Sequence, residues 1–126
     1  MKYKQYPKYI QLAIDRSIRH WERMIKWAKK QKKSLLVSGY DNPDMETEIG
    51  EYWNAYYCNL CKAFKTKEGD ELCFNNKIYC PLADKYGECG VRGSENNFLR
   101  VHNSKTWGQW VYNANIMLKQ LQSLRR

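Results

Sequence analysis

The chain has 126 residues and carries 22 Lys or Arg against 13 Asp or Glu, a net charge of +9. This length allows one domain with a single hydrophobic core. The N-terminal residues include no apolar stretch as long as a signal peptide requires, and the longest purely apolar run, Leu35 to Val37, is far too short to cross a bilayer. We therefore expect a cytoplasmic protein without a membrane partner.

The charge is distributed unevenly along the chain. Residues 1–37 hold eleven basic and two acidic side chains, residues 38–57 hold five acids and no base, and residues 91–126 hold six bases and one acid. Basic terminal segments of this kind favour an anionic partner, such as nucleic acid, a nucleotide or an acidic protein surface. A solvated surface that keeps the protein soluble explains the same charge run equally well.

The first predicted element is a helix from about Pro7 to Lys33. Its apolar residues recur at helical spacing, and they are Ile10, Ile14, Ile18, Trp21, Ile25 and Ala28. Met24 and Trp27 lie beside this stripe and widen the apolar face. His20 has arginines around it in the sequence, which predicts a surface or interface position for it.

A loop is predicted over residues 38–43. Asn42 then suits an N-cap, with Pro43 in the first turn of a second helix. Apolar residues spaced by four from Met45 to Leu60 predict that this helix continues into Cys58. Gly50 weakens the helix by about 1 kcal/mol relative to alanine.

The signals between Cys61 and Cys80 are weaker. Residues 66–70 suit a turn, and residues 71–74 and 77–80 each suit a short strand. Cys80 and Pro81 open a short helical turn that extends from Leu82 to Tyr86, and Gly87 closes it.

The last helix is predicted to begin after Asn103 or Ser104 as its cap. Its apolar stripe has helical spacing and consists of Trp107, Val111, Ala114, Leu118, Leu121 and Leu124. Together these elements predict one mainly α domain, residues 1–126, in which the N- and C-terminal helices pack together around a central cysteine knuckle with little or no β-structure. Its parts are a basic N-terminal helix (1–37), an acidic loop and helix (38–57), the knuckle (58–90), and a loop and C-terminal helix (91–126).

Five cysteines lie close together in the middle of the chain. Two thiolates separated by two residues can hold one metal ion from a tight turn, and the later cysteines can complete a tetrahedral zinc site. We predict zinc ligands at Cys58, Cys61, Cys80 and Cys89, with Cys73 as a substitute. An iron–sulfur cluster uses the same ligands and is the alternative. His102 is a further candidate ligand, but a structural hydrogen bond is its favoured role.

The knuckle at residues 57–62 and the run from Cys80 to Cys89, with its Cys-Pro start and its glycine before the final cysteine, carry a resemblance. They resemble a family of small uncharacterised proteins of bacteriophages and prophages. Family members often have a cysteine three residues before the Cys-Pro pair, whereas Cys73 here lies seven before Cys80. The resemblance implies a phage-encoded protein in the host cytoplasm, acting on host machinery, nucleic acid or immune signals.

No nucleophile elbow, phosphate-binding glycine loop or paired-carboxylate motif occurs in the sequence, so we expect no enzymatic activity. The predicted function is binding of nucleic acid, or of a host defence complex that handles nucleic acid, as an inhibitor or modulator. A sponge for a small nucleotide, with a pocket in an oligomer, is the alternative, and a structural or adaptor protein is the second alternative. Cations that contact phosphates and aromatic rings that stack on bases are the candidate binding residues: Arg16, Arg19, Arg23, Lys26, Lys29, Lys30, Lys32, Lys33, Arg100, Trp27 and Tyr112.

Overall fold

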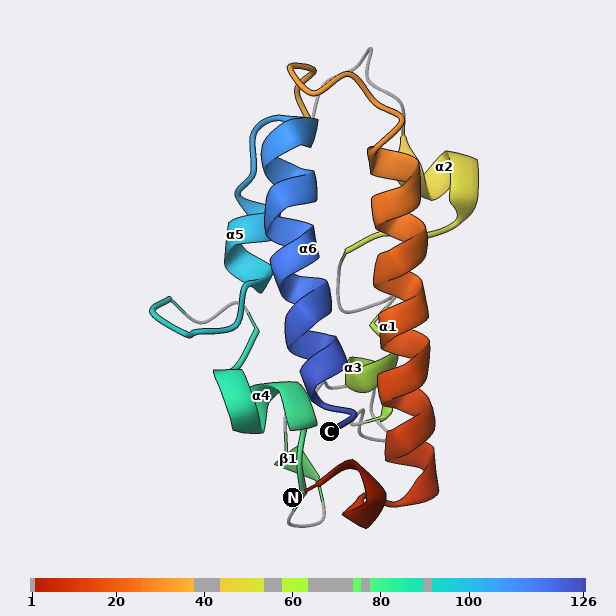
Figure 1. Ribbon diagram of the computed structural model, residues 1–126, viewed down its shortest axis with the longest axis vertical. Helices are drawn as coiled ribbons and strands as arrows, with labels where there is room; N and C mark the ends of the chain where they lie inside the picture. Colours follow the sequence, from red (N-terminus) through yellow and green to blue (C-terminus); the bar gives the residue numbers. More distant parts are fainter. Residues whose placement is uncertain (1, 38–43, 54–57, 64–73, 76–77, 90–91) are drawn as a thin grey trace.

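Two long antiparallel helices form the body of the protein (Figure 1). They are α1 (Lys8–Ala28) and α6 (Trp107–Ser123), which pack against each other along their length. The predicted mainly helical architecture with packed N- and C-terminal helices is confirmed. This computed structural model describes residues 2–37, 44–53, 58–63, 74–75, 78–89 and 92–126.

Helix α1 follows a short 3-10 turn, η1 (Tyr3–Gln5), and buries its predicted apolar stripe. It ends at Ala28 rather than at Lys33, because the following segment turns back along the start of α6. There the Gly108 N–H donates to the Lys33 carbonyl at 3.0 Å. Four residues later in the chain, the Val37 N–H donates to the Lys105 carbonyl at 2.8 Å.

Helix α6 begins later than predicted, with Thr106 as its cap. The Thr106 hydroxyl accepts a hydrogen bond from the Gln109 N–H at 3.3 Å. Neither expected cap, Asn103 or Ser104, has this role, and Asn103 instead ends another helix, α5 (Phe98–His102), which sequence reasoning did not predict. Helix α5 packs against α6.

In residues 44–53, the described part of the acidic segment, there is one short helix, α2 (Met45–Ile49). Its cap is Asp44, whose carboxylate accepts from the Glu46 N–H at 3.0 Å. Gly50 ends the helix in a left-handed conformation, with φ of 68°, where glycine carries little steric cost. The prediction that this helix continues into Cys58 is therefore wrong. The expected loop at residues 38–43 lies outside the described residues.

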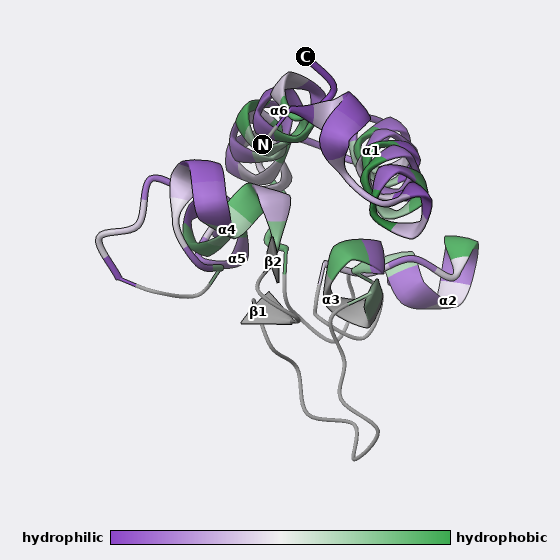
Figure 2. Cartoon of the chain, turned by 90° about the horizontal axis from the view of Figure 1, so that it is seen from below, coloured by the Kyte–Doolittle hydropathy of each residue, from purple (hydrophilic) through white to green (hydrophobic). Residues whose placement is uncertain are grey.

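The cysteine segment, residues 58–89, is built from short elements. They are α3 (Asn59–Ala63), the antiparallel strands β1 (Phe74–Asn75) and β2 (Ile78–Tyr79), and α4 (Pro81–Tyr86). The short helix closed by Gly87 is confirmed, and β2 lies within the strand expected at residues 77–80. Strand β1 shares only Phe74 with the strand expected at residues 71–74, whose other residues lie outside the described part of the chain, as does the turn expected at residues 66–70. Helix α3 packs on α1 and α4 contacts α6. Viewed from below, α2 and α3 lie beside α1, and α4 and α5 lie beside α6 (Figure 2).

All five tryptophans of the chain meet in one buried cluster between these helices. Trp21 of α1 stacks on Trp110 of α6, with ring centroids 6.1 Å apart. Trp53 lies 5.1 Å from Trp110, and Trp27 lies 5.1 Å from Trp107. Aromatic pairs at these separations stabilise a core beyond the area that they bury. Within the described part of the chain, no helix is long and apolar enough to cross a membrane.

Candidate functional site

The outer face of α1 carries a row of exposed cations. These residues share one side of the helix, and we call them the basic stripe: Lys8, Arg16, Arg19, Arg23 and Lys26. At about 100° per residue they fall within an arc of about 80°, and at about 1.5 Å per residue they extend over about 27 Å. The stripe is therefore a straight, one-sided array of positive charge. Exposed Tyr9 and Leu12, at 50% and 38%, lie on the same face.

Four of the five cations of the stripe form no ion pair. Within the described residues, Lys8, Arg16, Arg19 and Lys26 have no ion-pair partner. The exposed acid Glu22 lies beside the stripe but pairs with none of them. Asp15, at the edge of the face, instead accepts from the Tyr3 hydroxyl at 2.9 Å and pairs with Arg125 at 3.3 Å. The charge of the unpaired cations of the stripe is therefore available to an external anion.

Arg23 differs from its neighbours because Glu51 pairs with it. Arg23 Nε donates to Glu51 Oε1 at 2.7 Å, and a terminal guanidinium nitrogen lies 2.6 Å from the same oxygen. The other oxygen, Oε2, lies 2.5 Å from His20 Nδ1. Glu51 thus ties the acidic segment to α1 and neutralises much of the Arg23 charge.

His20 is a buried structural residue, so its predicted surface position is wrong. Only 2% of its surface is exposed, and its Nδ1–H donates to Glu51. Burial lowers the pKa of His20, and the nearby Glu51 carboxylate acts in the opposite direction without reversing the shift. Sequence reasoning missed this role because Glu51 is 31 residues away in the chain.

Trp27 is also buried and does not belong to the candidate binding surface. It is 7% exposed, and its indole Nε1–H donates to Glu48 Oε2 at 2.7 Å. A buried ring cannot stack on a base, so the expectation of a binding role is corrected. Tyr112 of α6, in contrast, is 68% exposed and is available for stacking.

Four further cations gather where α1 ends and the chain turns towards α6. We call them the lysine cluster, and all four are exposed: Lys29, Lys30, Lys32 and Lys33. Arg100 is exposed on α5, where its guanidinium donates to Asn97 Oδ1 at 3.1 Å. The first three backbone N–H groups of α6 donate to the carbonyls of Leu35 and Lys33 and to the Thr106 hydroxyl, so positive charge at this end comes from side chains.

The cysteine segment places its described thiols on different short elements. Cys58 is half-buried just before α3, Cys80 is buried at the start of α4, and Cys89 is half-buried after it. Buried Asn96 donates from Nδ2 to Cys89 Sγ at 3.1 Å. Such an N–H is a typical outer partner of a metal-bound thiolate. The Cys61 side chain and Cys73 lie outside the described residues.

Among the described residues, no three His, Cys, Asp or Glu side chains come together as a metal-binding group. His102, the further candidate ligand, is exposed on α5, and its ring stacks on Phe98 with centroids 6.1 Å apart. The four-cysteine zinc site therefore stays a prediction.

No protein-family model, no curated protein and no solved structure matches this chain significantly. The phage family indicated by the cysteine pattern stays a prediction, and the functional argument rests on the residues of this chain.

Proposed function

We propose that the protein is a non-enzymatic binding protein for nucleic acid, and that the basic stripe of α1 is its contact surface. The observation that carries the proposal is the set of exposed cations on one side of α1 that form no ion pair with the described residues, namely Lys8, Arg16, Arg19 and Lys26. Uncompensated cations in a row attract a polyanion and release its counterions on binding.

The kind of residue supports a phosphate backbone as the ligand. The guanidinium groups of Arg16 and Arg19 present planar pairs of N–H donors that suit phosphate oxygens. Tyr9 is half-exposed on the same face and can stack on an unpaired base, while the lysine cluster extends the positive charge beyond the end of α1. In the phage setting that the cysteine pattern implies, the target is host nucleic acid or a defence complex that carries it, and the protein acts as an inhibitor or modulator.

The test is the salt dependence of binding to single- and double-stranded oligonucleotides. The triple variant Arg16→Gln, Arg19→Gln, Lys26→Gln removes three exposed charges from the stripe. We expect it to reduce the slope of log affinity against log salt by about 2–3, since each lost phosphate contact contributes about 0.7–0.9. Filter binding over a salt series measures this slope.

A matched control removes the same charge elsewhere. The triple variant Arg92→Gln, Lys105→Gln, Lys119→Gln changes three exposed cations that lie outside α1. It should keep most of the salt slope. Equal losses in the two variants would mean that only net charge matters, and full binding by the stripe variant would contradict the proposal.

We infer in addition that a structural zinc ion stabilises the cysteine segment, held by the thiolates of Cys58, Cys61, Cys80 and Cys89. Cys73 is the substitute ligand and an iron–sulfur cluster is the alternative cofactor. The N–H that Asn96 directs at Cys89 Sγ supports a thiolate at that position. Four thiolates would close a site of the structural kind, which contributes folding free energy rather than catalysis.

A further inference from the structure

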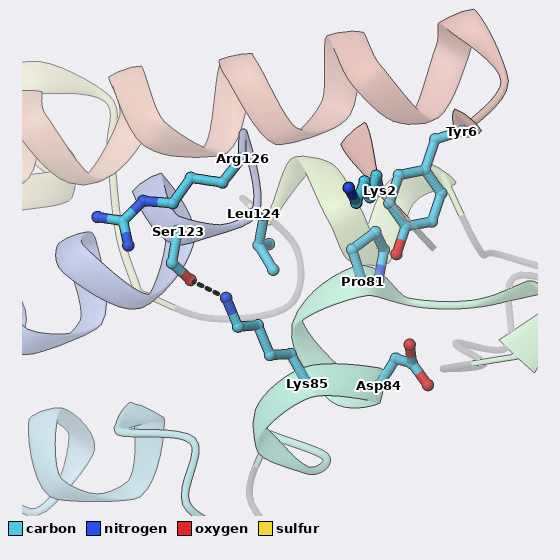
Figure 3. A pocket seen from close by; sticks show the side chains of 8 residues that line it. All are labelled: Lys2, Tyr6, Pro81, Asp84, Lys85, Ser123, Leu124 and Arg126. Atoms are coloured by element: carbon cyan, nitrogen blue, oxygen red, sulfur yellow. Dashed lines mark hydrogen bonds between the residues drawn. The ribbon is translucent and has the colours of Figure 1, made fainter. Parts of the chain in front are cut away.

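A pocket of about 240 Å³ lies where the N-terminal segment, α4 and the end of α6 meet (Figure 3). Its apolar walls are Pro81 and Leu124, which are buried. Typical ligand pockets measure about 300–1,000 Å³, so this one suits a small ligand or one end of a larger molecule.

The charged side chains around the pocket are mostly positive. Lys2, Lys85 and Arg126 line it together with a single acid, Asp84, a side-chain balance of +2. A phosphate monoester carries a charge of about −1.5 to −2 at neutral pH, so the pocket and such a group are complementary.

Lys85 is exposed, but its ammonium group contacts two neighbouring side chains. Its Nζ donates to Ser123 Oγ at 3.1 Å and lies 5.5 Å from the centre of the Tyr86 ring. The Ser123 hydroxyl is fixed in turn, because it donates to the Gln120 carbonyl at 2.6 Å. Figure 3 shows the Lys85 ammonium directed from α4 towards α6. An ordered cation loses less conformational freedom when it binds an anion.

Tyr6 adds a hydroxyl that has no partner. Only 8% of Tyr6 is exposed, the residue lines the pocket, and its hydroxyl makes no hydrogen bond with the described residues. The oxygen is not one of the buried side-chain atoms that lack a partner, so it reaches solvent through the pocket and can donate to a ligand that enters there.

We propose that this pocket binds the phosphate group of a small phosphate monoester. Lys2, Lys85 and Arg126 supply the positive charge and the Tyr6 hydroxyl donates to a phosphate oxygen. Asp84 accepts from a hydroxyl or amino group of the ester part. The phosphate belongs either to a free nucleotide or to the end of a nucleic-acid strand. The proposal does not depend on the basic stripe, because none of the pocket residues belongs to it.

Calorimetric titration with inorganic phosphate, adenosine and adenosine 5′-monophosphate tests the site. Phosphate and the monophosphate should bind, and adenosine should not. Tyr6→Phe keeps the buried ring and removes only the hydroxyl, and Lys85→Gln removes one charge. Each should weaken binding of the monophosphate about tenfold, as expected for the loss of one hydrogen bond to a charged group. Asp84→Asn should strengthen binding of inorganic phosphate, because it removes the one negative charge.

The controls separate this site from the rest of the surface. Tyr9→Phe, on the exposed face of α1, should leave binding of the monophosphate unchanged, and so should the triple variant of the basic stripe. Adenosine binding as tightly as its monophosphate, or wild-type affinity in both Tyr6→Phe and Lys85→Gln, would overturn the proposal. So would loss of phosphate binding in the stripe variant alone.

Oligonucleotides with a 5′-phosphate or a 5′-hydroxyl then identify the source. If the wild type prefers the 5′-phosphorylated oligonucleotide and Tyr6→Phe abolishes this preference, the pocket binds the ends of nucleic-acid strands. Monophosphate binding without such a preference assigns it to free nucleotides.

Discussion

The pair of long helices and the cysteine segment are held together in different ways. Helices α1 and α6 have 21 and 17 residues, and they bury a continuous apolar face that includes four of the five tryptophans. The described elements of residues 58–89 have only two to six residues each. Isolated helices shorter than about 12 residues and single hairpins are marginal in water. The helix pair thus has a core of its own, whereas the short elements of the cysteine segment depend on contacts with that pair and, as we propose, on a metal ion held by its thiols.

Loss of the thiolate ligands should produce the largest effect, and it tests the dependent region. The purified protein should contain about one zinc per chain, and Cys58→Ser or Cys61→Ser should unfold the cysteine segment and lead to aggregation, because metal-binding free energy is folding free energy in such segments. Elemental analysis and circular dichroism before and after chelation measure both effects.

The zinc prediction would be contradicted if the anaerobically purified protein contained no metal and its thiols formed disulfides. A brown protein with visible absorption would redirect it to an iron–sulfur cluster. In either case the cysteine segment would need another source of stability.

The next largest effect on stability is expected from a substitution in the core of the helix pair. Trp110→Ala removes a fully buried ring at the centre of the tryptophan cluster and should lower the free energy of unfolding by about 3–5 kcal/mol. Tyr112→Ala, on the exposed face of the same helix, should change it by no more than about 0.5 kcal/mol. Urea unfolding followed by circular dichroism measures both. Similar losses in the two variants would contradict the placement of the core.

The smallest effect concerns His20, which joins the helix pair to the acidic segment. Burial lowers its pKa in the folded protein, so below about pH 6.5 the unfolded chain takes up a proton that the folded chain does not. The contribution of this pKa shift to the free energy of unfolding is fully present above that pH, and it is lost as the pH decreases towards the folded-state pKa. Urea unfolding at about pH 7.5 and pH 5.5 should show a larger loss for the wild type than for His20→Gln. A gain in wild-type stability on acidification would mean that the Glu51 carboxylate, and not burial, dominates.

Local patterns in the sequence predicted the elements that depend on local chemistry. The apolar period of α1 and α6 and the Pro81 and Gly87 ends of α4 were all readable from the chain. The same period also places the basic stripe, because Lys8 and Lys26 lie out of phase with the buried residues. Sequence reasoning nevertheless overlooked Lys8, since it considered the charges of the helix together rather than by face.

Contacts between residues that are far apart in the chain determined the features that local sequence patterns did not predict. Trp27 and His20 look exposed beside Lys26 and Arg19, yet Glu48 and Glu51 from the acidic segment cover them. Helix α5 was missed because five residues are too few to show an apolar period, and its packing on α6 selects the conformation. The zinc ligands remain a prediction because two of the five thiols, those of Cys61 and Cys73, lie outside the described part of the chain.

The tryptophan cluster also determines what an optical experiment can detect. Residues 58–90 contain no tryptophan, while every indole of the chain lies in the cluster between α1, α6 and Trp53. Intrinsic tryptophan fluorescence therefore reports opening of the helix pair and is nearly blind to local loosening of the cysteine segment. Tyrosine emission does not isolate that segment either, because it contains only two of the ten tyrosines, Tyr79 and Tyr86. Amide hydrogen exchange does isolate it. A chelator that speeds exchange in residues 58–89 before the indole signal changes would show that the domain unfolds in two steps, and that its two halves do not share one cooperative transition.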